Sequence, residues 1–139
     1  PRLDQKGCWF IPHVQVVPAG MEIEIVNDDG VLHNIHTFST LNPPVNMAQP
    51  KFKKILSHAF ARPDVVKVTC DVHGWMNAWI VVASHPYYAV TAEDGGFTMS
   101  DVPGGTYTLR AWHEALGTRE QTISVVPGGT AEAAFRFGG

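Results

Sequence analysis

The stretch that decides the fold is residues 66–82, VKVTCDVHGWMNAWIVV. Its first part alternates apolar and polar residues with a period of two, which is typical of a half-buried β-strand. Because Cys70 shares the parity of Val66 and Val68, its side chain is predicted to point into the core. The apolar run at residues 79–82 predicts a second strand. A short loop that begins at a buried cysteine therefore joins two strands.

This loop and one upstream motif carry four metal-binding side chains. His73 and Met76 follow Cys70 with the spacing C-x-x-H-x-x-M, and His33 lies in the motif LHNIH at residues 32–36. One thiolate, two imidazoles and a weak thioether form the ligand set of a blue-copper electron-transfer centre. Zinc also accepts cysteine and histidine, but a methionine argues against a structural zinc site. The prediction is a single copper ion per chain, bound by these four residues.

Over roughly residues 8–83 the two motifs resemble the cupredoxin family, in particular its amicyanin and plastocyanin-like members. The resemblance implies a Greek-key β-sandwich or barrel in which His33, Cys70, His73 and Met76 bind copper and His36 does not. Three further features carry the resemblance, namely FIP at residues 10–12, Gly20 and Asn27.

The resemblance also implies a function. The chain is expected to be a type 1 copper protein that transfers one electron between redox partners, and not an enzyme. A redox partner would dock near His73 and Trp75, although Trp75 could equally pack inward. Asn34 is expected to hydrogen-bond across to the copper loop, or to be a simple turn residue. Family members work in the periplasm or outside the cell, which is the expected location here.

Cys8 precedes the FIP segment, which the family folds toward its copper end. Three interpretations are open: a free buried thiol, an additional sulfur ligand in an altered or binuclear site, and a disulfide with Cys70. The last would remove the thiolate on which a blue-copper site depends.

The rest of the chain indicates an all-β protein with two modules. No segment shows sustained helical periodicity. Residues 14–16 and 23–25 are predicted to pair across a turn at residues 18–20, and residues 37–63 form a crossover of uncertain structure. We place a copper domain at residues 1–84 and a small β-sandwich module, packed on it, at 85–139. The strands predicted for the module are 87–92, 97–99, 107–112, 121–126 and 131–137.

The second module resembles the carboxypeptidase regulatory-like, transthyretin-like β-sandwich. The resemblance is carried by EDGGF at residues 93–97 and VPGGTYTL at residues 102–109. It implies an accessory module without catalysis. His85 and His113 have no ligand spacing and are not predicted to form a second metal site.

Composition excludes some functions. The formal net charge is -3, and the clustered lysines are confined to residues 51–54, so no basic stripe exists for nucleic acid. No apolar run approaches the roughly 20 residues that span a bilayer. Two alternatives to electron transfer stay open: copper delivery or storage, and a structural subunit in which copper is incidental. An oligomer or larger assembly is compatible with either.

Overall fold

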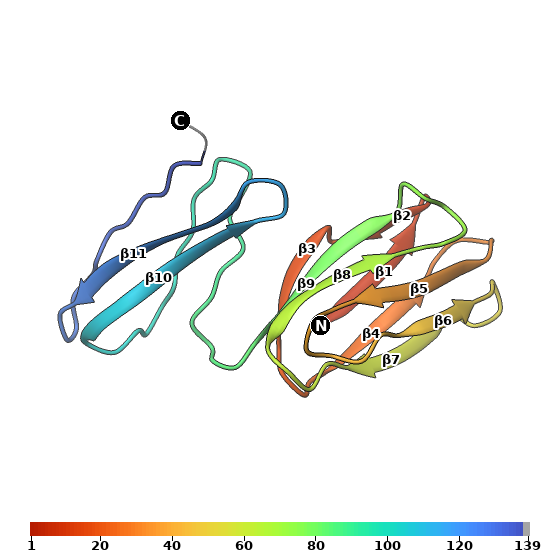
Figure 1. The fold of residues 1–139 in the computed structure, drawn as a ribbon, viewed down its shortest axis with the longest axis horizontal. Helices are drawn as coiled ribbons and strands as arrows, with labels where there is room; N and C mark the ends of the chain where they lie inside the picture. Colours follow the sequence, from red (N-terminus) through yellow and green to blue (C-terminus); the bar gives the residue numbers. More distant parts are fainter. Residues whose placement is uncertain (138–139) are drawn as a thin grey trace. The chain divides into compact units, whose positions relative to one another are not determined.

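The chain is built of β-strands and turns, as the sequence predicts. The computed structural model describes residues 1–137, and these contain eleven strands and no helix (Figure 1). The predicted all-β fold class is confirmed. Because no helix is present in this part of the chain, none is long and apolar enough to cross a membrane.

Two compact units divide the chain. The first is Pro1–Phe97, and the second begins at Thr98. The division of the sequence into modules after residue 84 stays a prediction.

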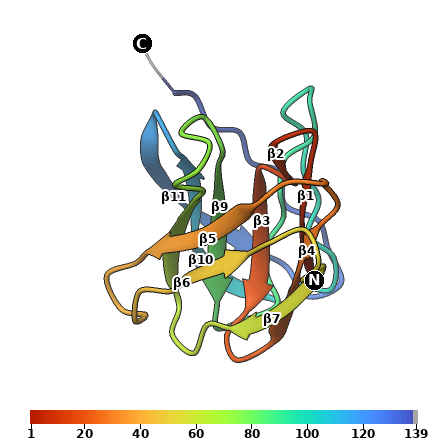
Figure 2. The ribbon, with the colours of Figure 1, turned by 90° about the vertical axis from the view of Figure 1, so that its right-hand side faces the viewer.

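Two separate sheets form the first unit, so it is a sandwich. One sheet has the strand order β2-β1-β4-β7 and the other β3-β9-β8-β5-β6 (Figures 1 and 2). The strands of the first sheet are β1 (Arg2–Lys6), β2 (Trp9–Ile11), β4 (Glu22–Asn27) and β7 (Ile55–Ala59). Those of the second are β3 (Val14–Pro18), β5 (His33–Phe38), β6 (Asn46–Gln49), β8 (Asp64–Thr69) and β9 (Asn77–Ala83).

The core lies between these sheets. Leu3 and Ile25 from one sheet meet Ile35, Val68 and Ile80 from the other in a single buried cluster. Burying each such side chain contributes about 1.5–3 kcal/mol. Cys70 and Met76 are members of the same cluster. The predicted inward parity of the cysteine is therefore confirmed.

The predicted pairing of the two early strands is wrong. Their turn forms as expected, with Gly20 at φ +80° and the Met21 N–H donating to the Pro18 carbonyl at 3.2 Å. The turn, however, carries the chain from one sheet to the other. Strand β3 pairs in parallel with β9, while β4 pairs with β1 and β7. Alternation of apolar residues is the same in either arrangement, so it could not distinguish them.

The crossover at residues 37–63 contains strands β6 and β7. The core-facing Gln49 of β6 is fully buried although it is polar. The strand therefore lacks the alternation of apolar residues from which it could have been predicted. Its Nε2 donates to the carbonyls of Ile25 at 3.0 Å and Lys54 at 3.2 Å. Its Oε1 accepts from Gln5 Nε2 at 2.6 Å. Buried amides thus join β6 to the opposite sheet.

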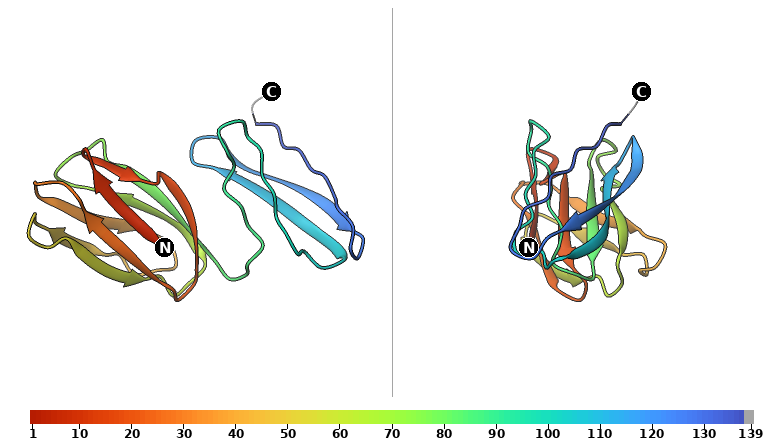
Figure 3. Two further views of the ribbon diagram at one scale, coloured as in Figure 1. Left: turned by 180° about the vertical axis from the view of Figure 1, so that it is seen from behind. Right: turned by 90° about the vertical axis from the view of Figure 1, so that its left-hand side faces the viewer.

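The second unit contains an antiparallel hairpin of β10 (Gly105–His113) and β11 (Gly117–Val125), seen from behind in Figure 3. The hydroxyl of Tyr107 donates to the Pro103 carbonyl at 2.6 Å and fixes the entry to β10. The other three predicted strands, 87–92, 97–99 and 131–137, are not strands in the part of the chain that the structure describes. Residues 131–137 contact the hairpin through a side chain, Gln121 Nε2 donating to the Ala134 carbonyl, in place of a backbone ladder.

Candidate metal centre

The loop between β8 and β9 is short and closed by its own backbone. The Cys70 N–H donates to the Met76 carbonyl at 3.3 Å, and the Met76 N–H donates to the His73 carbonyl at 3.0 Å. Cys70 and Met76 are 2% and 1% exposed. His73, midway between them, is only half-buried. The loop therefore holds a sulfur at each end in the core and an imidazole nearer the surface.

His33 meets this loop from the first residue of β5. Its side chain is completely buried. The Cys70 Sγ lies 3.8 Å from His33 Nδ1 and 3.9 Å from His73 Nδ1. The two imidazole rings are 4.9 Å apart, edge to face. Two nitrogens therefore flank one sulfur.

These distances can be compared with those of a metal site. A thiolate sulfur at about 2.3 Å and an imidazole nitrogen at about 2.1 Å from one ion, 110–120° apart, are separated by about 3.6–3.8 Å. The observed separations of 3.8 and 3.9 Å lie at the upper end of that range and 0.1 Å beyond it. Three of the four predicted ligands thus fit a single ion, and the fourth, Met76, is buried at the end of the same loop. A thiolate with two imidazoles is a donor set that suits copper.

Asp29 orients the buried histidine. Its Oδ2 lies 2.7 Å from His33 Nε2. An imidazole that donates from Nε2 to a carboxylate keeps the lone pair of Nδ1 for a metal, and such partners fix the ring orientation. The Nδ1 atom is the one that faces Cys70. Sequence reasoning missed Asp29, although its i, i+4 spacing from His33 was a usable signal.

The same carboxylate holds the turn between β1 and β2. Asp29 accepts the N–H of Gly7 at 2.8 Å and of Cys8 at 3.0 Å. Burial alone would raise the pKa of Asp29. The hydrogen bonds from His33, Cys8 and Gly7 outweigh this effect and hold the pKa below its ordinary value. Asp29 is therefore an anion that links two loops.

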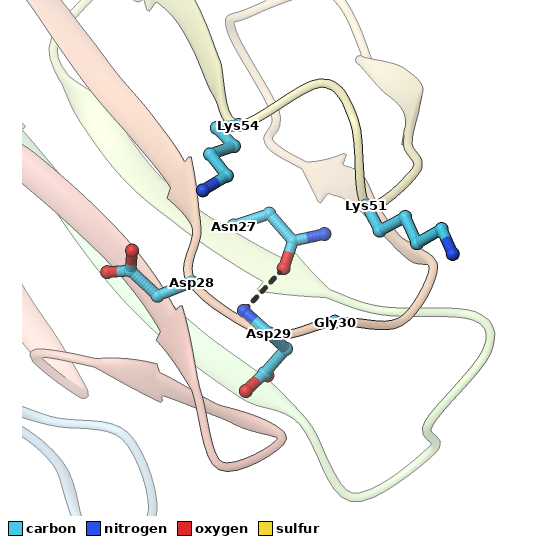
Figure 4. A pocket seen from close by; sticks show the side chains of 6 residues that line it. All are labelled: Asn27, Asp28, Asp29, Gly30, Lys51 and Lys54. Atoms are coloured by element: carbon cyan, nitrogen blue, oxygen red, sulfur yellow. Dashed lines mark hydrogen bonds between the residues drawn. The ribbon is translucent and has the colours of Figure 1, made fainter.

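Asn27 supports the loop that contains Asp29. Its Oδ1 accepts the Asp29 N–H at 3.0 Å, and Figure 4 shows this bond beside a pocket at the end of β4. Its Nδ2 donates to the carbonyls of Gln49 and Val31 at 2.9 and 3.0 Å. Lys51 and Lys54 line the same pocket.

Asn34 links the upstream motif to the loop between β8 and β9, as predicted. Its Oδ1 accepts the Asp71 N–H, and its Nδ2 donates to Asp71 Oδ2 at 3.0 Å. Its own backbone N–H points to Cys70 Sγ at 3.5 Å. Asn34 therefore joins the strand that carries His33 to the loop that carries Cys70 and His73.

Cys8 lies close to the two histidines. The ligand atoms of Cys8, His33 and His73 all lie within 4.8 Å of one another. Both cysteines are free thiols in this structure, so the disulfide interpretation does not describe it. Trp75 contacts both parts of the site: its Nε1 donates to the Cys8 carbonyl at 2.8 Å, and its ring lies 5.1 Å from that of His73. Trp75 is nevertheless 54% exposed, so it does not pack inward.

The remaining histidines that the sequence singled out have other partners. His36 Nδ1 lies 3.0 Å from Asp71 Oδ2, away from Cys70. His85 Nδ1 accepts the Tyr87 N–H, and His113 Nδ1 accepts the N–H groups of two residues in the turn that follows it. Among residues 1–137, no group of three metal-binding side chains includes any of the three.

Comparison with known proteins identifies the sequence family. The family model described as polysaccharide lyase family 4, domain II, matches residues 57–133, more than half of the chain. The chain belongs to this family. The polysaccharide lyase family 4 domain II match begins in β7, includes the loop from Cys70 to Met76, and continues past β11. A comparison with curated protein sequences found no match.

Solved structures are similar over about 60% of the chain. The copper-containing nitrite reductase from Thermus scotoductus SA-01 is 22% identical with a TM-score of 0.54 over 61% of this chain, which spans 22% of that enzyme. A purple cupredoxin from Nitrosopumilus maritimus is 20% identical with a TM-score of 0.50, covering 59% of this chain and 98% of its own.

A reduced Cu(I) mutant of amicyanin gives a similar result. It is 16% identical with a TM-score of 0.53, covering 59% of this chain and 80% of its own. These similarities show the cupredoxin fold over about 60% of this chain. The resemblance of residues 85–139 to the carboxypeptidase regulatory-like module stays a prediction.

Proposed function

We propose that the chain is a type 1 copper protein that carries single electrons between redox partners. The observation that supports this most strongly is Cys70 Sγ between His33 Nδ1 and His73 Nδ1, at 3.8 and 3.9 Å. Met76 is the fourth proposed ligand, at the end of the same loop. Copper bound there would supply a one-electron Cu(II)/Cu(I) couple.

The chain's own residues suit this role. Asp29 and Asn34 fix the donor groups from two sides, so little rearrangement is needed when the charge of a bound ion changes. His33 is fully buried, whereas His73 is half-buried next to the exposed Trp75. We therefore place electron entry and exit at His73, with a redox partner docking on Trp75. By resemblance to cupredoxins, we also propose a periplasmic or extracellular location and a non-enzymatic role.

Titration with Cu(II), followed by visible absorption and electron paramagnetic resonance, tests the copper site. One equivalent should produce an intense band from thiolate-to-copper charge transfer, and Cys70→Ser should abolish it. His33→Gln and His36→Gln form a matched pair on one strand: the first should disrupt the spectrum and the second should leave it unchanged. A wild-type spectrum without a Cys70-dependent band would refute the proposal.

Redox cycling distinguishes electron transfer from the alternatives. A carrier should be reduced and reoxidised repeatedly without losing copper to a chelator. Rapid loss of Cu(I) to the chelator would instead support delivery or storage. A structural subunit would keep the same assembly state with and without copper, which size-exclusion chromatography measures.

A further inference from the structure

We propose that Cys8 is a second thiolate ligand of the metal centre, so that the donor set contains two cysteines and two histidines beside Met76. This inference rests on the proposed function, because it concerns the same ion. The cupredoxin-like set of His33, Cys70, His73 and Met76 does not include it.

The distances of Cys8 carry the inference. Its Sγ lies within 4.8 Å of the ligand nitrogens of both His33 and His73. Sulfur and nitrogen bound to one ion are at most about 4.4 Å apart and usually about 3.6–3.8 Å apart. Cys70 lies outside this group of three, so binding of one ion by both sulfurs requires the partly buried Cys8 side chain to move toward Cys70. Cys8 Sγ therefore lies near a ring nitrogen of each of the two histidines that flank Cys70.

The backbone of Cys8 is held on both sides by the loops that bear the other ligands. Its N–H donates to Asp29, the residue that orients His33. Its carbonyl accepts from Trp75, which lies in the copper loop. A thiol positioned by both loops is pre-organised for the point where they meet.

The turn itself gives no reason for a cysteine. Gly7 and Cys8 are the two residues between β1 and β2, with φ values of +62° and +56°. Such left-handed turns favour glycine or asparagine, and other side chains are strained there. Chain geometry would therefore select another residue at position 8, whereas a metal-binding role accounts for the sulfur.

A second thiolate changes which metals the site accepts. Two thiolates and two imidazoles are also a tetrahedral zinc set. We therefore expect the wild-type chain to bind Zn(II) as a closed site, and to bind it more tightly than a chain that lacks the Cys8 thiol.

The test compares wild type with Cys8→Asn, a residue that tolerates the left-handed turn. X-ray absorption of the copper-loaded full chain should show two short sulfur neighbours in wild type and one in the variant. Competition with a chelator should show at least a roughly 10-fold loss of copper affinity. Cys8→Gly serves as a second variant, and circular dichroism checks that both are folded.

The outcomes separate the two proposals. A Cys70-dependent charge-transfer band together with equal sulfur counts and affinities in wild type and Cys8→Asn would overturn the role of Cys8 and leave the copper site standing. A wild-type chain without a Cys70-dependent band would overturn both. Two sulfur neighbours that both persist in Cys8→Asn would assign the second sulfur to Met76 and also overturn this inference.

Discussion

Replacing Asp29 by asparagine should loosen the metal centre and destabilise the fold. The carboxylate accepts hydrogen bonds from Gly7, Cys8 and His33 at 2.8, 3.0 and 2.7 Å. A hydrogen bond to a charged group contributes about 1.5–3 kcal/mol. Asparagine keeps one acceptor oxygen, so one or two of the three bonds are lost. We expect the free energy of unfolding of the copper-free protein to fall by about 2–4 kcal/mol.

Copper binding should weaken in the same variant. His33 would lose the partner that fixes its ring, and the loss of such a partner typically costs 10–100-fold in metal affinity, so we expect a decrease of roughly that size. Urea unfolding measures the first effect, and competition with a Cu(I) chelator measures the second.

Asp28→Asn is the matched control. Asp28 precedes Asp29 in the chain but is more exposed, and its ion pair with Arg2 is 3.5 Å long. An exposed pair of this kind contributes about 0–1 kcal/mol. Asp28→Asn should therefore retain copper affinity. If Asp29→Asn behaves like Asp28→Asn in both assays, Asp29 does not have the role that its three contacts indicate.

Two other predictions concern the scaffold. Asp64→Asn should reveal a pH-dependent contribution to stability. Burial raises the pKa of Asp64, but hydrogen bonds from residues 39–41 and 65 outweigh this effect and hold the pKa below its ordinary value. The advantage of wild type should be complete at neutral pH and vanish as the pH falls through the folded-state pKa, because a carboxyl with a depressed pKa stabilises only when ionised. A difference in the free energy of unfolding between wild type and Asp64→Asn that does not change with pH, measured by urea unfolding, would contradict this. Gln49→Leu should lower the free energy of unfolding by about 3 kcal/mol because it leaves buried amide partners unpaired. Gln15→Leu removes a hydrogen bond that is exposed and should lower it by less than about 1 kcal/mol. Equal decreases in melting temperature for the two variants would refute the importance of the buried amides.

Alternation and motif spacing predicted the parts of the fold that depend on local sequence. The parity of Val66 and Val68 correctly placed Cys70 in the core, and the structure places Nδ1 of the two predicted histidines 3.8 and 3.9 Å from Cys70 Sγ. The positions of these groups depend on a strand and a short loop, which a single sequence encodes directly.

Long-range partners could not be read in the same way. The parallel pairings of β1 with β4 and of β3 with β9 join segments whose alternation is equally compatible with other neighbours. Strand β6 was missed because Gln49 occupies a core position. Two of the contacts of Asp29 could not be predicted, because its hydrogen bonds to Gly7 and Cys8 cross about twenty positions of sequence; only its spacing from His33 is local.

The backbone bonds that close the loop from Cys70 to Met76 constrain its length more than its composition. Gly74 has open space where a Cβ would stand, so an alanine Cβ at that position meets no neighbour. An inserted residue, in contrast, would break the register between the Cys70 N–H and the Met76 carbonyl. Divergence in this segment should therefore proceed by substitution, and grafting a longer segment from another protein would require a new spacing between its donors.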